Sequence, residues 1–290
     1  MDAQDRVTRQ GDTAYTYDAS GMVTTRTVSG QASQAFAWDA RGSLLSVAQA
    51  PAPSVAYDVD AAERRVAKRR NGTRTRIWRY AGQLNIDAEV VAPESGAPSY
   101  RMYGYIGDRF LPVVMQERTA LGESKTYRIY GDHLGSLRAV VDVSTGEAVQ
   151  TMAHDPWGKV THDAVAPGFE RVPFGYAGGL YDEDTGLSRF GAREYDATTG
   201  RWLSKDEAGF AGGANFYLYA NDNPVSYVDR DGKNPIIAAV ALAIVLGMKL
   251  RPGGNPARGP RAQRLGLLRP PDDDGARLGL RRKGDGRRRE

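Results

Sequence analysis

An aromatic residue followed by aspartate recurs near the N-terminus, and this pattern limits the possible folds more than any other feature. The pairs are 21 and then 19 residues apart: Tyr17-Asp18, Trp38-Asp39 and Tyr57-Asp58. In the first two units a glycine lies three residues after the aspartate, and an alternating stretch follows. Asp-x-x-Gly is typical of a tight turn and alternation is typical of a strand. The units therefore predict successive β-hairpins, with an ordinary β-meander and coincidental pairs as the alternative.

Composition supports short strands and excludes several kinds of site. The chain has 290 residues, 9% aromatics and 34 glycines, which favours strands joined by turns over helices. It has no cysteine, which excludes disulfides, thiolate metal sites and a cysteine nucleophile. The first ten residues are polar and charged, so no signal peptide is expected. The chain is thus expected to be cytoplasmic at synthesis, or to be a piece of a longer protein.

The positive charge is concentrated at the C-terminus. Residues 249–290 hold 13 basic and 5 acidic residues, whereas the whole chain has a net charge of only +4. This tail is rich in Arg, Pro and Gly and has no apolar period, so it is predicted to be disordered. Its arginines can bind nucleic acid or anionic lipid nonspecifically. The 13 uncharged residues 236–248 are shorter than the roughly 20 that span a bilayer, which favours packing within the protein.

The stretch 189–235 is the richest in aromatic and acidic residues, and it carries the candidate chemistry. Asp206 and Asp229 lie 23 residues apart, on either side of an expected aromatic hairpin at 215–219. Such an excursion can bring two carboxylates face to face, where repulsion raises one pKa and leaves the other group ionised. A pair of this kind can activate water and protonate a leaving amide, with Arg193 holding a carboxylate or the carbonyl oxygen. The alternative is that both aspartates only accept hydrogen bonds from turn amides.

Ordered motifs over residues 10–235 carry a family resemblance. They include Tyr130-Gly-Asp-His-Leu-Gly-Ser-Leu-Arg138, Asp155-Pro-Trp-Gly158, Phe174-Gly-Tyr-Ala-Gly178, Ala192-Arg-Glu-Tyr-Asp196, Gly200-Arg-Trp202, Asn215-Phe-Tyr-Leu-Tyr219 and Asp229-Arg-Asp-Gly232. The chain resembles the C-terminal part of an RHS/YD-repeat protein, including the RHS repeat-associated core. The resemblance implies an all-β spiral of hairpins that forms part of a hollow shell. It also implies four segments, with YD repeats at 10–125, the core at 126–235, an apolar segment at 236–248 and a variable basic tail at 249–290.

The resemblance implies a function for the carboxylates as well. The sequence has two acidic turns, the first at Ser204-Lys-Asp206 and the second at Asp229-Arg-Asp-Gly232. Related proteins enclose a C-terminal toxin and cut their own chain with an aspartate pair just after the turn that corresponds to the second acidic turn. Matched to this sequence, the aspartates are Asp206 and Asp229, the supporting arginine is Arg193, and the cut bond is Lys233–Asn234. Three residues depart from the family pattern: Glu207 and Arg230 replace prolines, and Lys233 replaces an apolar residue. We therefore expect impaired self-cleavage, with no cofactor or metal.

The implied partners are the chain's own C-terminal segment and other chains of a toxin complex or secretion system, which would deliver the protein outside the cell or to its surface. Two other functions fit the sequence. One is a carbohydrate- or surface-binding module whose exposed aromatics stack on sugars, and the other is a truncated remnant without function.

Two further candidate sites are more simply explained by structure. His133 lies in a turn, and neither His154 nor His162 stands at a ligand spacing from it, so we expect a structural histidine that hydrogen-bonds the turn. The acidic loop Asp182-Glu183-Asp184 lacks the alternating ligands of a calcium loop. It is therefore predicted to be solvated surface.

Overall fold

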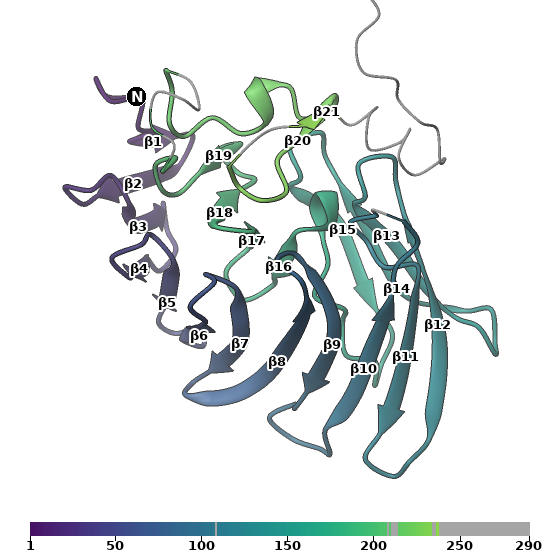
Figure 1. The fold of residues 1–290 in the computed structure, drawn as a ribbon. Helices are drawn as coiled ribbons and strands as arrows, with labels where there is room; N and C mark the ends of the chain where they lie inside the picture. The colour runs from purple at the N-terminus through teal and green to yellow at the C-terminus, as the bar shows by residue number, and fades with distance from the viewer. Residues whose placement is uncertain (108, 208, 210–213, 234–235, 238–290) are drawn as a thin grey trace, which may run out of the picture. The chain divides into compact units, whose positions relative to one another are not determined.

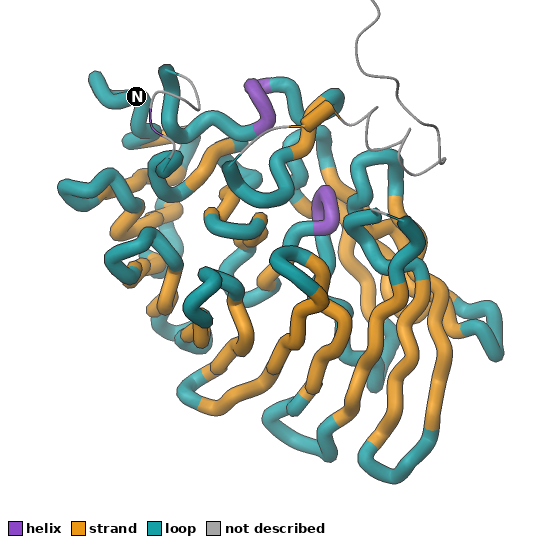
Figure 2. The backbone as a smooth tube through the Cα atoms, viewed as in Figure 1, coloured by secondary structure: helices purple, strands orange, loops and turns teal. Residues whose placement is uncertain are grey.

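The computed structural model describes residues 1–107, 109–207, 209, 214–233 and 236–237. By its internal contacts the chain divides into a unit Met1–Leu250 and a unit Arg251–Glu290, and the second lies wholly outside the described residues. The described residues form strands and turns almost throughout, with short 3-10 helices at η1 (Tyr176–Gly178) and η3 (Ala220–Asp222) (Figure 2). The expected all-β fold is confirmed.

One antiparallel sheet of fifteen strands contains the N-terminal two thirds of the described chain (Figure 1). Each strand pairs with the next one along the sequence, so the sheet is a continuous series of hairpins that stays open between β1 and β15. Its strands are β1 (Arg9–Gln10), β2 (Thr13–Tyr17), β3 (Val23–Val28), β4 (Gln34–Trp38), β5 (Leu44–Ala48), β6 (Val55–Val59), β7 (Arg65–Arg70), β8 (Thr73–Ala81), β9 (Asn85–Val91), β10 (Ser99–Gly104), β11 (Val114–Thr119), β12 (Ser124–Gly131), β13 (Leu137–Asp142), β14 (Ala148–His154) and β15 (Val160–Val165).

Two smaller sheets follow in the segment that carries the candidate site. Four strands pair in chain order in the first, β16 (Leu180–Asp182), β17 (Leu187–Phe190), β18 (Arg193–Asp196) and β19 (Arg201–Trp202). The second pairs β20 (Tyr227–Val228) with β21 (Ile236–Ile237). The rest of the predicted apolar segment 236–248, and the predicted tail 249–290, lie outside the described residues. Within the residues the structure describes, no helix is both long and apolar enough to cross a bilayer.

Aspartate side chains close the hairpin turns. In the first repeat Asp18 accepts a hydrogen bond from the Met22 amide, and in the second Asp39 accepts from the amides of Arg41 and Ser43. The third repeat is two residues later than the sequence suggested, because the turn aspartate is Asp60 and not Asp58. The turn aspartates are therefore 21 residues apart at both steps. The aromatic-Asp pattern was misleading here because Glu63 occupies the glycine position of the turn, with φ of 63°.

This departure predicts a stabilising substitution. A side chain in the left-handed region costs about 1–2 kcal/mol, and glycine avoids that cost. Glu63→Gly is therefore expected to raise the free energy of unfolding by about 1 kcal/mol, measured by urea denaturation. Glu123→Gly is the matched control, because Glu123 is an exposed turn residue without positive φ. Equal effects of the two substitutions would contradict this explanation.

Buried hydrogen bonds and ion pairs attach the β16–β19 segment to the large sheet. Tyr15 of β2 and Tyr57 of β6 donate their hydroxyls to Asp196 and Asp182, at 2.8 and 2.7 Å. The Lys68 ammonium lies 2.7 Å from a carboxylate oxygen of both Asp182 and Asp184. Burial opposes ionisation of Asp182, but the charge of Lys68 and the hydrogen bonds from Lys68 and Tyr57 together outweigh it and lower the pKa of Asp182. The prediction of a solvated acidic loop was therefore wrong at Asp182, which is buried in this interface.

An aromatic cluster forms the core around the candidate site. Most of its rings lie in edge-to-face or tilted contact, with centroids 4.3 Å apart for Tyr195 and Tyr219 and 5.3 Å apart for Trp202 and Tyr219. Phe190 and Tyr176 complete the cluster. These residues come from η1, β17, β18, β19 and the position just before η3, so their packing fixes the positions of the turns between those elements.

Candidate active site

Backbone hydrogen bonds bring the three predicted site residues together. Arg193 begins β18, whereas Asp206 and Asp229 lie in turns after β19 and β20. The Leu203 amide donates to the Glu194 carbonyl, and the Asp206 amide donates to the Phe216 carbonyl. The predicted hairpin at 215–219 was wrong, because this stretch is a turn with a single bridge between Leu218 and Arg201, continued by η3. The chain still returns beside Asp206, as the face-to-face arrangement requires.

The guanidinium of Arg193 connects the two carboxylates. Its Nη2 lies 2.8 Å from Asp206 Oδ2 and 3.3 Å from Asp229 Oδ2. The guanidinium carbon lies 4.3 Å from the ring centroid of Trp202, and Nε donates to the Gly232 carbonyl oxygen. Arg193 is 5% exposed and Asp229 is 1% exposed. These charges therefore interact in a poorly solvated environment, where their attraction is strong.

A third carboxylate completes the site, that of Asp231, which is not among the site residues predicted from the sequence. The Lys233 amide donates to Asp229 Oδ1 and to Asp231 Oδ1, each at 3.0 Å. Burial raises the pKa of Asp229 to about 7; Arg193 opposes this rise, and a hydrogen bond with Asp231 adds to it. The only signal in the sequence was the Asp-x-Asp spacing within the second acidic turn. Near neutral pH the site thus holds a protonatable carboxyl beside other acidic groups.

Two glycines allow the close approach of the second acidic turn. Gly191 and Gly232 have φ of 46° and 68°. A Cβ on Gly191 would lie 2.3 Å from the Asp231 carbonyl oxygen, and one on Gly232 would lie 2.5 Å from the Phe190 carbonyl oxygen. The Ala192 amide donates to the Asp231 carbonyl at 3.0 Å. The acidic turn is therefore held against the β17–β18 turn at backbone contact distance.

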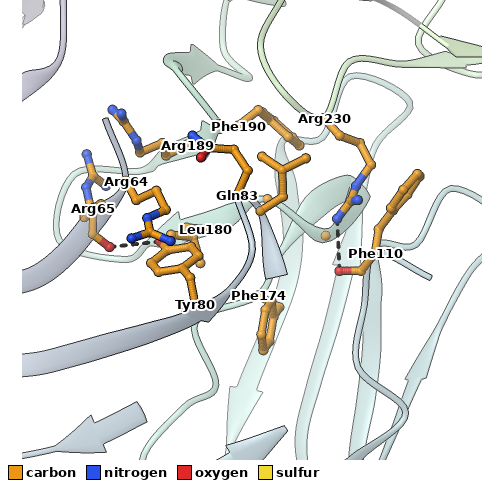
Figure 3. A pocket seen from close by; sticks show the side chains of 14 residues that line it. Arg64, Arg65, Tyr80, Gln83, Phe110, Phe174, Leu180, Arg189, Phe190 and Arg230 are labelled. Carbon is orange, nitrogen blue, oxygen red and sulfur yellow. Dashed lines mark hydrogen bonds between the residues drawn. The ribbon is translucent and has the colours of Figure 1, made fainter. Parts of the chain in front are cut away.

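The residues that depart from the family pattern have partners of their own. Lys233 replaces an apolar residue, and its ammonium pairs with the carboxylate of Glu207. Arg230 replaces a rigid proline, and its guanidinium carbon lies 3.1 Å from the ring centroid of Phe110. It also donates to the Phe110 carbonyl at 3.2 Å, as Figure 3 shows. Burial lowers the pKa of Arg230 to about 9. Asn234 lies outside the described residues.

The cavity behind Arg230 is too small to be a ligand site. It lies beside the second acidic turn and is lined by Arg64, Arg65, Arg189, Phe110 and Tyr80, among others (Figure 3). Its volume is about 40 Å³. Small-molecule pockets usually measure roughly 300–1,000 Å³, so this space suits a water molecule or two at most.

The histidines lie apart from this site. His133 is exposed, and the amides of its turn donate to Asp132. The turn hydrogen bonds that were expected of His133 are thus made by Asp132, which accepts them. Burial lowers the pKa of His154 to about 4, and its ring packs against Tyr176. His162 Nε2 lies 2.9 Å from the Thr151 hydroxyl. Among the described residues, no three His, Cys, Asp or Glu side chains are arranged to hold a metal ion.

Comparison with known proteins agrees with this fold. The family model described as Teneurin YD-shell matches residues 1–225. The tRNA nuclease WapA of Bacillus subtilis is 32% identical over 233 residues, which is 78% of this chain and 9% of WapA. Teneurin-3 of Danio rerio is 28% identical over 244 residues, 78% of this chain and 8% of that protein. The chain thus spans about a tenth of the length of these relatives.

The solved structures that are similar share the fold. The Tc holotoxin pore of Photorhabdus luminescens aligns with a TM-score of 0.57 and 23% identity, over 76% of this chain and 11% of that one. The TcdB2–TccC3 structure aligns with a TM-score of 0.53 and 20% identity, over 76% and 13% of the two chains. Arg193 and Asp206 lie within the family match, whereas Asp229 lies four residues beyond its end.

Proposed function

The chain belongs to the Teneurin YD-shell family, and from this membership we propose that it is the shell fragment of an RHS-type toxin that encloses its C-terminal segment and releases it by self-cleavage. The observation that carries the proposal is the contact of one Arg193 nitrogen with both Asp206 and Asp229. The second of these aspartates lies four residues before the end of the expected shell fragment at Lys233, and the apolar segment and the variable tail follow. A buried arginine–carboxylate pair there has a chemical use as well as a structural one.

The proposed chemistry is hydrolysis of the protein's own backbone by carboxyl groups. A carboxylate removes a proton from water, a protonated carboxyl donates to the leaving nitrogen, and a cation stabilises the developing oxyanion. Asp229 supplies the protonated group near neutral pH, since burial raises its pKa to about 7. Asp206 and Arg193 supply the base and the cation. By the resemblance, the cut bond is Lys233–Asn234.

Toxin-related names among the relatives support enclosure of a toxin and delivery outside the cell. Besides the tRNA nuclease WapA, they include the Double-stranded DNA deaminase toxin A of Burkholderia cenocepacia, 26% identical over 76% of this chain and 17% of that protein. The proposed partners are the tail itself and further chains of a toxin complex. The repeat aromatics give less support to carbohydrate binding, because Tyr57 is buried and Tyr17 and Trp38 are only partly exposed.

Intact-mass measurement on residues 1–290 with an N-terminal tag tests this function. We expect the wild-type chain to appear as a fragment ending beside Lys233, together with the released tail. Asp206→Asn and Asp229→Asn should each remain uncut, because each removes one of the two carboxyl groups that move protons. Asp222→Asn is the matched control, since Asp222 is exposed on the same segment and its φ of 60° suits asparagine. An uncut wild-type chain would reject self-cleavage and favour a shell or remnant without release.

A further inference from the structure

A cleft of about 690 Å³ lies apart from the candidate active site, whose three residues do not line it. It is formed mainly by three segments, which are β1 with the residues before it, the β14–β15 turn and the β18–β19 turn. The Gln10 side chain donates to the Thr198 carbonyl at 3.1 Å, which joins the first segment to the third. Small-molecule pockets usually measure roughly 300–1,000 Å³, so this cleft is large enough for an organic ligand.

Trp157 gives the cleft an aromatic surface that is held in one position. Its amide donates to Asp155 Oδ1 at 2.9 Å, and its carbonyl oxygen accepts from the Tyr195 hydroxyl at 2.7 Å. The indole ring lies against Gly200, where a Cβ would be 2.6 Å from the ring atom Cε3. Trp157 is only partly buried and lines the cleft, so its ring can pack against a flat apolar face of a ligand.

Three cations without a carboxylate partner line the same cleft. Arg9 and Lys159 are exposed, and among the described residues neither side chain forms a hydrogen bond or an ion pair. Arg201 is partly buried, and its buried Nη1 has no hydrogen-bond partner in the described part of the chain. The buried Arg65 and Arg101, by contrast, contact the carboxylates of Glu194 and Glu117. Because a buried guanidinium donor without an acceptor is costly, an anionic group in the cleft would be stabilising.

Two carboxylates in the cleft narrow the class of ligand. Asp155 and Asp222 line it together with the three cations. A nucleic-acid strand carries one negative charge per nucleotide, and these carboxylates would repel it. Sugar hydroxyls, however, can donate to a carboxylate and also exchange hydrogen bonds with the exposed Thr198 hydroxyl. The cleft therefore suits a ligand with one acidic group, several hydroxyls and one apolar ring face.

We propose that this cleft binds an acidic saccharide, in which a sugar ring carries one carboxylate among its hydroxyl groups. The C–H face of the sugar packs on Trp157, and Arg201 donates to the carboxylate inside the cleft. Arg9 and Lys159 attract the same carboxylate from the exposed side. The site lies outside the repeats and does not depend on self-cleavage. It gives the protein a means of attachment to acidic glycans on a cell surface.

Isothermal titration calorimetry with the untagged chain 1–290 tests the proposal. The acidic probes are sialyllactose and trigalacturonic acid, lactose is the neutral match of the first, and decathymidylate represents nucleic acid. We expect at least one acidic saccharide to bind with a dissociation constant below about 1 mM, and lactose to bind more weakly by at least about ten-fold. Binding of neither acidic saccharide, equal binding of lactose, or binding of decathymidylate alone would overturn the inference.

Variants separate the cleft from the basic tail, which all of them share. Arg9→Ala with Lys159→Ala should weaken binding of the acidic saccharide by at least about ten-fold, because each removes a charged contact. Arg118→Ala with Lys125→Ala is the matched control, since it removes the same charge from exposed positions outside the cleft. Trp157→Leu should weaken binding by a similar factor, with thermal unfolding as the check of its fold. Equal losses in the two double variants would show that only net charge matters and would overturn the inference.

Discussion

Glu194→Ala is expected to destabilise the fold by roughly 3–5 kcal/mol, because it leaves buried charges without a partner. Glu194 is fully buried, and its Oε1 lies 2.7 Å from Arg65 and 2.8 Å from Arg189. Arg65 comes from β7 of the large sheet, whereas Arg189 and Glu194 come from β17 and β18. Alanine would remove the one anion that, within the described part of the chain, both guanidinium groups contact, and with it a link between the sheets. Urea denaturation measures the loss.

An exposed ion pair provides the comparison for this experiment. Arg79 and Asp87 lie 2.9 Å apart with side chains 67% and 30% exposed, so Asp87→Ala should cost about 0–1 kcal/mol. Glu194→Gln should fall between the two, since it keeps the shape and an acceptor but removes the charge. A loss for Glu194→Ala no larger than that for Asp87→Ala would show that the buried carboxylate does not attach the core segment to the sheet.

The strands could be predicted from the sequence because alternation is a local property. The alternating stretches that follow the first two repeat turns do form strands, β3 and β5. β11 begins only at Val114, after Pro112, because proline cannot donate to a strand pair. The third repeat was misplaced for a similar local reason, the glutamate at the glycine position of its turn.

The site could be predicted only in part, because its contacts join residues far apart in the chain. Arg193, Asp206 and Asp229 were named through the family resemblance, and the structure brings them together. Asp231 and the pairing of Glu207 with Lys233 depend on how three turns meet in space, which no spacing rule encodes. The same holds for the acidic loop, whose buried partner Lys68 is 114 residues from Asp182.

The rate of self-cleavage is expected to fall about ten-fold for each pH unit above pH 7. The reason is that Asp229 must be protonated to donate to the leaving nitrogen, and burial raises its pKa to about 7. Below pH 7 the Asp229 carboxyl is largely protonated, so the cleavage rate is expected to change little with pH there. Chain purified in urea, where it is unfolded and uncut, is diluted into buffers from pH 6 to 8.5, and the fragment is followed over time. The range stops there because the pKa of Arg230 is lowered to about 9.

Asp231→Asn distinguishes deprotonation of Asp229 from a general effect of pH on folding as the cause of the falling cleavage rate. The hydrogen bond and the charge of Asp231 both raise the pKa of Asp229. Removing that negative charge should move the midpoint of the falling limb to lower pH, while the control Asp222→Asn leaves it in place. The acid would then be less protonated at pH 7, so the variant should also cut more slowly there than the wild type. A rate that stays constant from pH 6 to 8.5, or the same midpoint in all three proteins, would exclude Asp229 as the proton donor.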